Sequence, residues 1–420
     1  MNDKRTKTAI IGSGISGLST ALALADQDDL TVFEYSDTPG GDARTVEVEV
    51  DGQTVPVDTG FIVFNKKNYP NLVRFFEYLN VDVIDSDMSF GVSVGRGDIE
   101  YSSKHILAQK RNIFRPKFWQ MVCDILQFNR KAKSGIEDLQ GKTLGDYLNE
   151  METGPWFRRI YLQAMGAAIW SCSAETILKY PANRFLKFFD NHGLLSVDDH
   201  PQWSTIRGGS RVYVSRIADK LGSRLKLGCG AASVKREDGK ITVLDTRGAK
   251  HSFDRIVFAC HADQTVKILQ DMDEEEEDTL KAFTFQTNKT VLHTDARLMP
   301  KRKKAWASWV YLARKIKEER PSVSLSYWMN NLQELKCKTP VINTVNPEHK
   351  IDESLILDRN TFAHPVFDKA AVHAQEQIHR IQGRNQTYHC GAWLGYGFHE
   401  DGITSGLKVL NYMGAKVPWA

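Results

Sequence analysis

The chain has 420 residues, of which 41% are apolar and 25% are charged, so it can bury a large core, and its length favours two domains. With 55 basic against 52 acidic side chains the formal net charge is only +3, and the composition gives no sign of nucleic-acid binding. No apolar run reaches the roughly eighteen residues of a membrane span, and the polar start lacks the apolar core of a signal peptide. The six cysteines include no C-x-x-C pair, so we expect a cytoplasmic protein without a disulfide framework or a metal site.

The first apolar run predicts a dinucleotide-binding βαβ unit. Residues 8–11 form a strand-like run, and Gly12, Gly14 and Gly17 follow in the G-x-G-x-x-G spacing. The first glycine allows a tight turn, the second lets a pyrophosphate approach the backbone, and the third lets the helix pack on the strand. A second strand ends at Glu34, whose carboxylate can bind ribose hydroxyls, which favours an adenosine without a 2′-phosphate. The expected cofactor contacts in this unit are Gly12, Ser13, Gly14, Ile15, Ser16, Gly17, Glu34 and Tyr35.

The segment after the second strand indicates which dinucleotide is bound. Gly40, Gly41 and Arg44 resemble the glycine pair and basic residue of FAD enzymes in the flavin amine oxidase and phytoene desaturase superfamily. The resemblance implies that Gly41, Asp42 and Arg44 meet the FAD diphosphate, for which a permanently charged guanidinium is suited. A turn with a solvated arginine is the alternative. Asp42 departs from the histidine or arginine of many relatives, and because a carboxylate repels a diphosphate we expect its side chain to point away.

Further strings resemble the same superfamily. The string from Asp58 to Phe64 resembles one that passes beside the isoalloxazine, which implies contacts from Thr59, Gly60 and Phe61, although a glycine-broken strand would look alike. The resemblance also implies that Val234 presents its backbone to adenine. Near the end, a strand and a glycine-rich loop resemble the motif whose helix N-terminus faces flavin O2 and stabilises negative charge on the reduced ring. The implied contacts there are Trp393, Gly402 and Ile403.

Three residues are candidates for catalysis. In the amine oxidase alignment, His399 corresponds to an aromatic-cage position, where it could contact substrate or move a proton, and Glu400 follows it. Lys289 falls near the position of a lysine that binds a water beside flavin N5. The alternatives are a histidine that satisfies a local hydrogen bond and a surface lysine on a strand.

The pattern predicts an α/β protein in which a Rossmann-like FAD-binding domain of the amine oxidase type is interleaved with an α+β substrate domain. The FAD-binding domain is expected at residues 1–66, 204–284 and 385–420. The substrate-binding domain, with a helical lid, is expected at 67–203 and 285–384. Segments 166–173 and 185–195 are rich in large apolar side chains, which suit either a hydrophobic substrate or an ordinary core.

Within the superfamily the sequence most resembles bacterial predicted FAD-binding proteins that are similar to the N-terminal oxidase domain of plant cyclopropane fatty acid synthases. Strings such as 188–195 and 395–402 carry this resemblance. It implies desaturation of a modified fatty acyl chain, such as a methylated or cyclopropane fatty acid of phospholipids, by hydride transfer to flavin N5. An amine oxidase of small amines or polyamines and a non-catalytic FAD-binding partner of a lipid methyltransferase remain alternatives.

Two segments combine cations with aromatic side chains, at residues 111–119 and 301–309. Such segments could rest on an anionic membrane, with aromatics at headgroup depth and cations on phosphates, so the protein could be peripheral at the inner face of the cell membrane. A lid helix with a basic solvent side, or a solvated turn, would give the same pattern.

Overall fold

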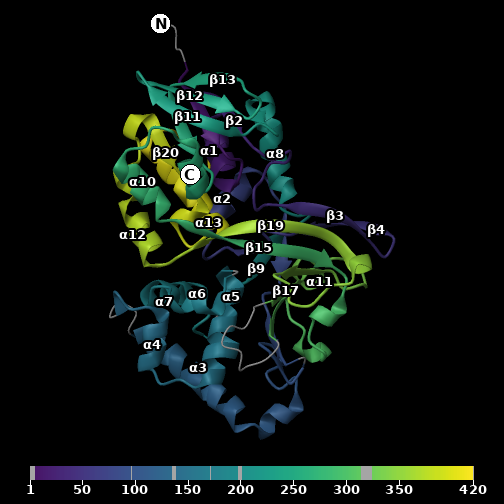
Figure 1. Ribbon diagram of the computed structural model, residues 1–420. Coiled ribbons are helices and arrows are strands. Elements are labelled where there is room, and N and C mark those ends of the chain that lie inside the picture. The colour runs from purple at the N-terminus through teal and green to yellow at the C-terminus, as the bar shows by residue number, and fades with distance from the viewer. Residues whose placement is uncertain are drawn as a thin grey trace.

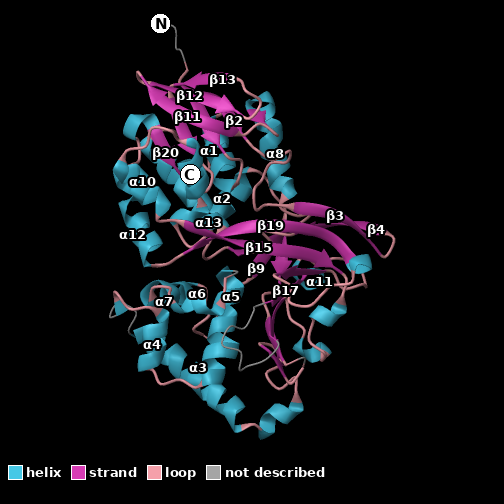
Figure 2. Ribbon diagram, viewed as in Figure 1, coloured by secondary structure: helices cyan, strands magenta, loops and turns pink. Residues whose placement is uncertain are grey.

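The computed structural model describes residues 5–95, 97–134, 139–170, 172–196, 201–313 and 324–419. Figures 1 and 2 show two parts, one around a parallel sheet with helices and one around a long mixed sheet and a helical region. The chain passes between the parts several times, so each is built from segments far apart in sequence.

A five-stranded parallel sheet forms the centre of the first part, in the order β10-β2-β1-β14-β20. Each strand pairs in parallel with its neighbours, and apolar runs such as 9–11 are buried on both faces, as parallel sheets require. All five strands fall within the segments 1–66, 204–284 and 385–420 expected for the nucleotide domain. Their bounds are β1 (Lys7–Ile11), β2 (Asp29–Phe33), β10 (Leu225–Lys226), β14 (Arg255–Phe258) and β20 (Thr387–His389).

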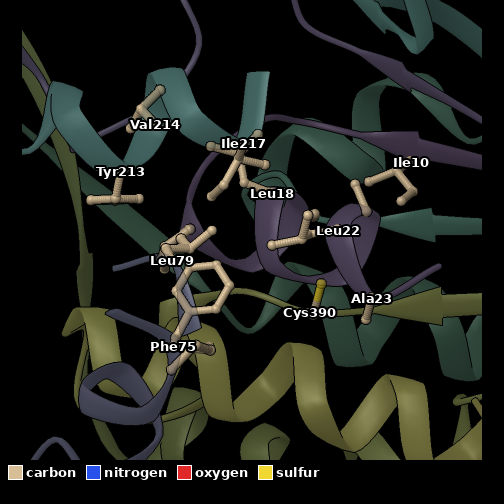
Figure 3. Close-up of a cluster of buried hydrophobic side chains, with 14 of the residues drawn as sticks. Ile10, Leu18, Leu22, Ala23, Phe75, Leu79, Tyr213, Val214, Ile217 and Cys390 are labelled. Carbon is tan, nitrogen blue, oxygen red and sulfur yellow. The ribbon is translucent and has the colours of Figure 1, made fainter. Parts of the chain in front are cut away.

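Helix α1 (Ile15–Leu24) lies in the middle of this part, and all ten of its residues are buried. Figure 3 shows Leu18 and Leu22 of α1 within a cluster that includes Ile217 and Phe75. These partners come from α8 (Arg211–Leu221) and α2 (Pro70–Tyr78), and α13 (His399–Tyr412) packs on α1 as well. Helix α2 therefore contributes to the nucleotide-domain core, although its sequence falls in the range 67–203 expected for the substrate domain.

Smaller elements surround the parallel sheet. The antiparallel strands β11, β12 and β13 form a separate three-stranded sheet, and β3 and β4 form a hairpin. Their bounds are β3 (Thr45–Val50), β4 (Gln53–Asp58), β11 (Ala231–Glu237), β12 (Lys240–Asp245) and β13 (Lys250–Phe253), and the flanking helices are α9 (Ala262–Ile268), α10 (Glu274–Lys281) and α12 (Lys369–Gln377).

The second part contains a seven-stranded mixed sheet in the order β19-β15-β18-β17-β16-β7-β8. Residues directly opposite each other in antiparallel strands share a face, so Asn343, Tyr327 and Trp309 line the same side of this sheet. We call this side the inner face, since it meets the segment at Thr59. The strands are β7 (Phe90–Val94), β8 (Ile99–Ser102), β15 (Thr284–His293), β16 (Trp309–Ala313), β17 (Ser324–Trp328), β18 (Ile342–Val345) and β19 (Ile356–Val366).

The helical region has its own aromatic core, in which Phe118, Phe157, Phe185 and Trp170 are buried. It comprises the 3₁₀ helix Lys110–Phe114, α3 (Pro116–Ser134), α4 (Leu144–Glu150), a π-helical segment (Phe157–Leu162), α5 (Gln163–Trp170), α6 (Ala174–Leu178) and α7 (Ala182–Asn191). A small sheet of β5 (Phe64–Asn65), β9 (Trp203–Ile206) and β6 (Val83–Ser86) and the short helix α11 (Met329–Leu332) complete the main elements. Much of the aromatic content of segments 166–173 and 185–195 is therefore core.

Candidate functional site

The three glycines after β1 have different surroundings. A Cβ on Gly12, whose φ is +103°, would lie 2.9 Å from the Ala259 carbonyl oxygen, and a Cβ on Gly17 would lie 2.0 Å from the Gly12 carbonyl oxygen. A Cβ on Gly14 would meet nothing within 4 Å. The first and third glycines thus serve the packing of strand and helix, whereas Gly14 borders open space where a phosphate group can approach the backbone.

The N-terminus of α1 is prepared for an anion. No side chain caps it, and its first turn carries no acidic residue, so its amide groups keep their donor capacity and positive partial charge. Ile15 and Ser16 of this turn lie against α13, because a Cβ on Gly402 would come 2.7 Å from Ile15 Cγ2 and 3.1 Å from Ser16 Oγ. The starts of two helices from opposite ends of the chain therefore meet, with Ile403 fully buried behind Gly402.

The Glu34 carboxylate is fixed at the end of β2. Ser13 donates its backbone N–H (2.9 Å) and its hydroxyl (2.6 Å) to Glu34 Oε2, and the Ser36 N–H donates to Oε1 (2.8 Å). Tyr35 beside it is 78% exposed. Since each carboxylate oxygen can accept more than one hydrogen bond, Glu34 keeps capacity for hydroxyl donors such as those of a ribose.

The glycine pair lies directly on the glycine-rich loop. Gly40 donates its N–H to the Ser13 carbonyl oxygen (3.0 Å), and a Cβ on Gly41 would come within 3.1 Å of Gly14 Cα. Asp42 is exposed, and its carbonyl accepts the Phe61 N–H (2.8 Å). Gly14 and Gly41, both predicted to contact phosphate, therefore lie side by side. The Asp42 backbone joins this region to the Thr59–Phe61 segment.

Arg44 has a protein partner that sequence reasoning missed. Its guanidinium makes a bidentate pair with Asp358 of β19, at 2.7 and 3.1 Å, and Nη1 also donates to Thr59 Oγ1 (3.1 Å). Arg44 therefore ties the glycine-pair segment to the large sheet. A contact of its remaining donors with a diphosphate stays a prediction.

The segment Thr59–Phe61 lies against the inner face of the large sheet. Asn343 donates Nδ2 to the Thr59 carbonyl oxygen (3.1 Å), while its Oδ1 is buried without a hydrogen-bond partner. A Cβ on Gly60 would lie 2.1 Å from the Asp42 carbonyl oxygen and 3.1 Å from the Phe362 ring, so only glycine lets the Gly60 and Asp42 backbones approach so closely. A buried acceptor without a donor usually marks a place where a ligand or water binds. The unpaired Asn343 Oδ1 lies beside Thr59, where the flavin ring is expected. No pattern in the sequence had indicated a role for Asn343.

His399 begins α13 and is enclosed by aromatic rings. It stacks on Phe61 with ring centroids 3.7 Å apart and planes 13° from parallel, and Nε2 lies 3.1 Å from the Tyr213 hydroxyl. Burial lowers the pKa of His399 to about 3, so the imidazole is neutral at physiological pH. It can form an aromatic wall and a hydrogen bond, but it is a weak base.

The two carboxylates after His399 serve the backbone. Glu400 accepts the N–H groups of Asn71 (3.1 Å) and Leu72 (2.9 Å) at the start of α2, and burial raises its pKa. Asp401 accepts the Phe398 N–H (2.9 Å), and burial raises its pKa to about 6. Asp401 therefore holds the loop before α13 in place, and Glu400 joins the start of α13 to the start of α2, which indicates a positioning role for Glu400.

Lys289 is exposed on β15, on the side opposite its buried neighbour Asn288. Asn288 points to the inner face, where its Nδ2 lies 2.7 Å from His364 Nδ1 and its Oδ1 accepts from Asn346 (2.8 Å). Because side chains alternate along a strand, Lys289 points away from the inner face. Its predicted contact with a flavin-bound water gains no support from this arrangement.

The backbone of Val234 has a partner within the protein, and its predicted contact with adenine stays a prediction. Val234 is fully buried, and its carbonyl accepts the Gln270 N–H (3.0 Å), so this backbone is already used. Gly230, just before β11, packs against Tyr35, since a Cβ on Gly230 would be 3.1 Å from Tyr35 Cβ. Trp393 is likewise buried, with its indole N–H donated to the Cys260 carbonyl oxygen (3.1 Å), and its role as a cofactor contact remains a prediction.

Within the described ranges, no three histidine, cysteine or acidic side chains are grouped so as to hold a metal ion. Over the same ranges, no helix is long and apolar enough to cross a bilayer. A cavity of about 420 Å³ lined by Arg297, Lys301 and Leu312 lies away from the inner face, so it is separate from this site.

Solved structures share this fold over nearly the whole chain. A CLA-producing fatty acid isomerase from P. acnes gives a TM-score of 0.65 at 16% identity, covering 98% of this chain and 99% of that chain. Putrescine oxidase bound to putrescine gives 0.70 at 13% identity, with 98% and 99% covered. Cyclohexylamine oxidase from Brevibacterium oxydans IH-35A gives 0.70 at 13% identity, with 97% and 98% covered. At such identities the likeness shows the fold alone.

No curated protein sequence matches the chain significantly. The sequence profile of the family described as flavin containing amine oxidoreductase matches residues 15–332, which is most of the chain. The predicted α/β fold of the flavin amine oxidase type is confirmed, and the structure adds that the FAD-binding sheet is parallel and the substrate-domain sheet is mixed. The open space at Gly14 and the uncapped N-terminus of α1 fit FAD as the cofactor. The chain is therefore a member of the flavin containing amine oxidoreductase family, an FAD-dependent oxidoreductase.

Proposed function

We propose that this enzyme desaturates a modified fatty acyl chain, such as a methylated or cyclopropane chain of a phospholipid. The observation that carries the proposal is a cluster of uncharged aromatic side chains, part of it buried in the core of the helical region, that begins beside His399 and Phe61. Phe398 stacks on Phe188 of α7 at 5.1 Å between ring centroids, and Phe188 contacts Trp170 at 4.8 Å. Such a cluster suits a hydrocarbon chain.

The charges near this cluster favour an acidic headgroup over an amine. The Glu400 and Asp401 carboxylates accept the backbone N–H groups of Leu72 and Phe398, so both have a local structural role. Arg184 of α7 lies over the Tyr396 ring, 5.8 Å from its centroid, and lines a small cavity with Trp170. A guanidinium at this place would repel an ammonium group and attract a carboxylate or phosphate.

Two further comparisons support this substrate class. The strings at 188–195 and 395–402 resemble bacterial proteins that are similar to the oxidase domain of plant cyclopropane fatty acid synthases. One solved structure of the same fold is a fatty acid isomerase, so this fold accommodates fatty acids in at least one protein. The amine oxidases of this fold supply the competing substrate class, which the experiment below tests.

Bound FAD supplies the acceptor for a hydride from the substrate carbon. The protein's own residues then have three tasks. The N-terminus of α1 would stabilise the diphosphate, and the N-terminus of α13 would stabilise the negative charge that the reduced ring gains. Phe61 and His399 form a rigid wall that excludes water and orients the acyl chain, and Arg184 holds its acidic end. Because His399 is neutral and weakly basic, water is the expected acceptor of the proton that leaves the neighbouring carbon.

The test is anaerobic mixing of the FAD-loaded protein with candidate substrates while the visible flavin absorbance is followed. Phospholipids with cyclopropane or methyl-branched chains should bleach the flavin, whereas putrescine and cyclohexylamine should not. The Arg184→Gln variant should require at least about tenfold more lipid for the same rate, because a charged hydrogen bond is lost. Arg380→Gln, which changes an exposed arginine, is the matched control.

Two outcomes would overturn the proposal. Bleaching by amines but not by lipids would make the protein an amine oxidase. Retained FAD with no bleaching by either class would favour a non-catalytic flavoprotein, for which co-purification with a lipid methyltransferase would be the next observation to seek.

A further inference from the structure

We infer that the end of the helical region docks on an anionic phospholipid bilayer. The docking surface, called the tip surface here, has an apolar centre and a basic rim. The centre consists of Ile106, Leu107, Ile113, Phe114 and Trp119, and the rim includes Lys104, Lys110, Lys117, Lys303 and Lys304.

The apolar centre is unusually exposed. Phe114 is 85% exposed, Trp119 45%, Ile106 and Ile113 44% each, and Leu107 37%. Elsewhere in the described residues, the large apolar side chains of comparable exposure are Tyr35, Tyr78, Leu126 and Tyr412, and of these only Leu126 lies near the centre, two turns along α3 from Trp119. A cluster of exposed apolar side chains in one segment marks an interaction site rather than ordinary surface.

The charge of the same segment is of one sign. Between Glu100 and Asp124 the chain contains five lysines and arginines and no acidic residue. Arg111 and Arg115 both pair with Asp98, so this nearby carboxylate is already neutralised. Lys110 and Lys117 are exposed on either side of Phe114.

A second basic segment is held against the first by Glu100, whose carboxylate is fully buried. Glu100 accepts the backbone N–H of Lys301 (2.7 Å) and pairs with the Arg302 guanidinium (2.8 Å). From the other side, Asn112 donates to the Glu100 carbonyl oxygen (3.2 Å), and Ser102 donates to the Lys304 carbonyl oxygen (3.2 Å). The two basic and aromatic segments, almost two hundred residues apart, therefore form one surface.

The chemistry of the tip surface fits a bilayer better than a nucleic acid. Isoleucine and leucine side chains cannot stack on bases, but they gain free energy in the acyl region, while lysines reach the phosphates. The Trp119 indole N–H is already donated to the Ile113 carbonyl oxygen (2.9 Å), so this ring can enter the interface without an unpaired donor. Figure 1 shows α3 far from β12 and β13, so docking would leave the nucleotide-binding part away from the membrane.

The experiment measures binding of the full-length FAD-loaded protein to vesicles by sedimentation. Vesicles of phosphatidylcholine with phosphatidylglycerol should bind the protein, and vesicles of phosphatidylcholine alone should bind it at least about tenfold more weakly, with the difference decreasing at high salt. This measurement needs no turnover, so its failure is distinguishable from failure of the proposed substrate.

Two variants separate the apolar centre from the basic rim. Ile113→Ser/Phe114→Ser should weaken binding to both kinds of vesicle by about tenfold or more, since exposed side chains should not be needed for folding. Lys110→Gln/Lys117→Gln/Lys303→Gln/Lys304→Gln should abolish most of the preference for phosphatidylglycerol. Tyr412→Ser and Lys66→Gln/Lys67→Gln change exposed residues outside the tip surface and should bind as the wild type does.

The inference is wrong if the wild-type protein does not sediment with anionic vesicles, or if both tip variants bind like the controls. A change of oligomeric state in the Ile113→Ser/Phe114→Ser variant, with vesicle binding unaltered, would instead make this surface a contact between copies of the chain.

Discussion

His399 lies flat on the ring of Phe61, 3.7 Å away, while its Nε2 lies 3.1 Å from the buried Tyr213 hydroxyl. Burial lowers the pKa of His399 to about 3, so the imidazole does not titrate between pH 6 and 9. We expect His399→Phe to preserve the pH profile of substrate-dependent flavin reduction over this range, measured by anaerobic stopped flow. If the rate of flavin reduction falls at low pH in the wild type but not in the variant, His399 does carry a proton in this range.

The same substitution should cost stability for a reason that can be tested separately. It leaves the Tyr213 hydroxyl without a partner in a fully buried place, which should lower the free energy of unfolding by about 1–3 kcal/mol. Tyr213→Phe/His399→Phe removes the unpaired hydroxyl as well and should recover most of the loss in urea unfolding.

Gly14→Ala and Gly17→Ala should separate cofactor binding from folding. A methyl group on Gly14 enters open space, so the FAD-free protein should unfold at an unchanged temperature, while FAD binds at least about tenfold more weakly because the backbone can no longer approach the phosphates. On Gly17 it would lie 2.0 Å from a backbone oxygen, so the FAD-free protein itself should be destabilised or fail to fold. Calorimetry and FAD titration distinguish the two, and equal effects on folding would contradict this assignment.

Glu276→Gln should be strongly destabilising, whereas Glu275→Gln should not. Glu276 is 1% exposed and makes a bidentate pair with the buried Arg236, at 2.7 Å for each bond. Breaking a buried ion pair leaves an uncompensated charge and should cost about 3 kcal/mol or more, while the exposed pair of Glu275 with Arg384 is worth at most about 1 kcal/mol. Chemical denaturation of the two variants measures both, and similar losses would show that Asp271 alone suffices for Arg236.

His389 should make the protein sensitive to acid. Its side chain is fully buried and unpaired, and burial lowers its pKa to about 3 from an unfolded value of 6.5. The unfolded state therefore binds the proton first, so the contribution is intact above pH 6.5 and is lost as the pH falls towards 3. At pH 5 the loss should be about 2 kcal/mol. His389→Phe should reduce the difference in unfolding free energy between pH 7 and pH 5 by that amount. An unchanged difference would show that another group takes up the proton on unfolding.

Features encoded by local spacing were predictable from the sequence. Three such features are the turn after β1, the position of Glu34 and the loop before α13, each of which depends on residues close together in the chain. The glycines in them are required for different steric reasons. The FAD cofactor and the interleaved α/β fold followed from these motifs and from the family resemblance.

The remaining features depend on contacts between distant residues or on register. No sequence pattern links Arg44 with Asp358, or Asn343 with Thr59, because neither pair lies within one element. Lys289 illustrates the second difficulty, since a shift of one residue along a strand moves a side chain to the opposite face. The strand that contains Val234 has an irregular register between Ala231 and Ser233, which spacing alone did not reveal.

The last strand of the parallel sheet, β20, begins at Thr387 and can pair with β14, which ends at Phe258, only after the 128 residues between them have been made. At about 5–20 residues per second, the ribosome needs roughly 6–26 s for this stretch. During that time β14 has an unpaired edge and α1 lacks its contact with α13, so the nascent protein should depend on chaperones, and chains that terminate early should be degraded rather than accumulate as flavoprotein.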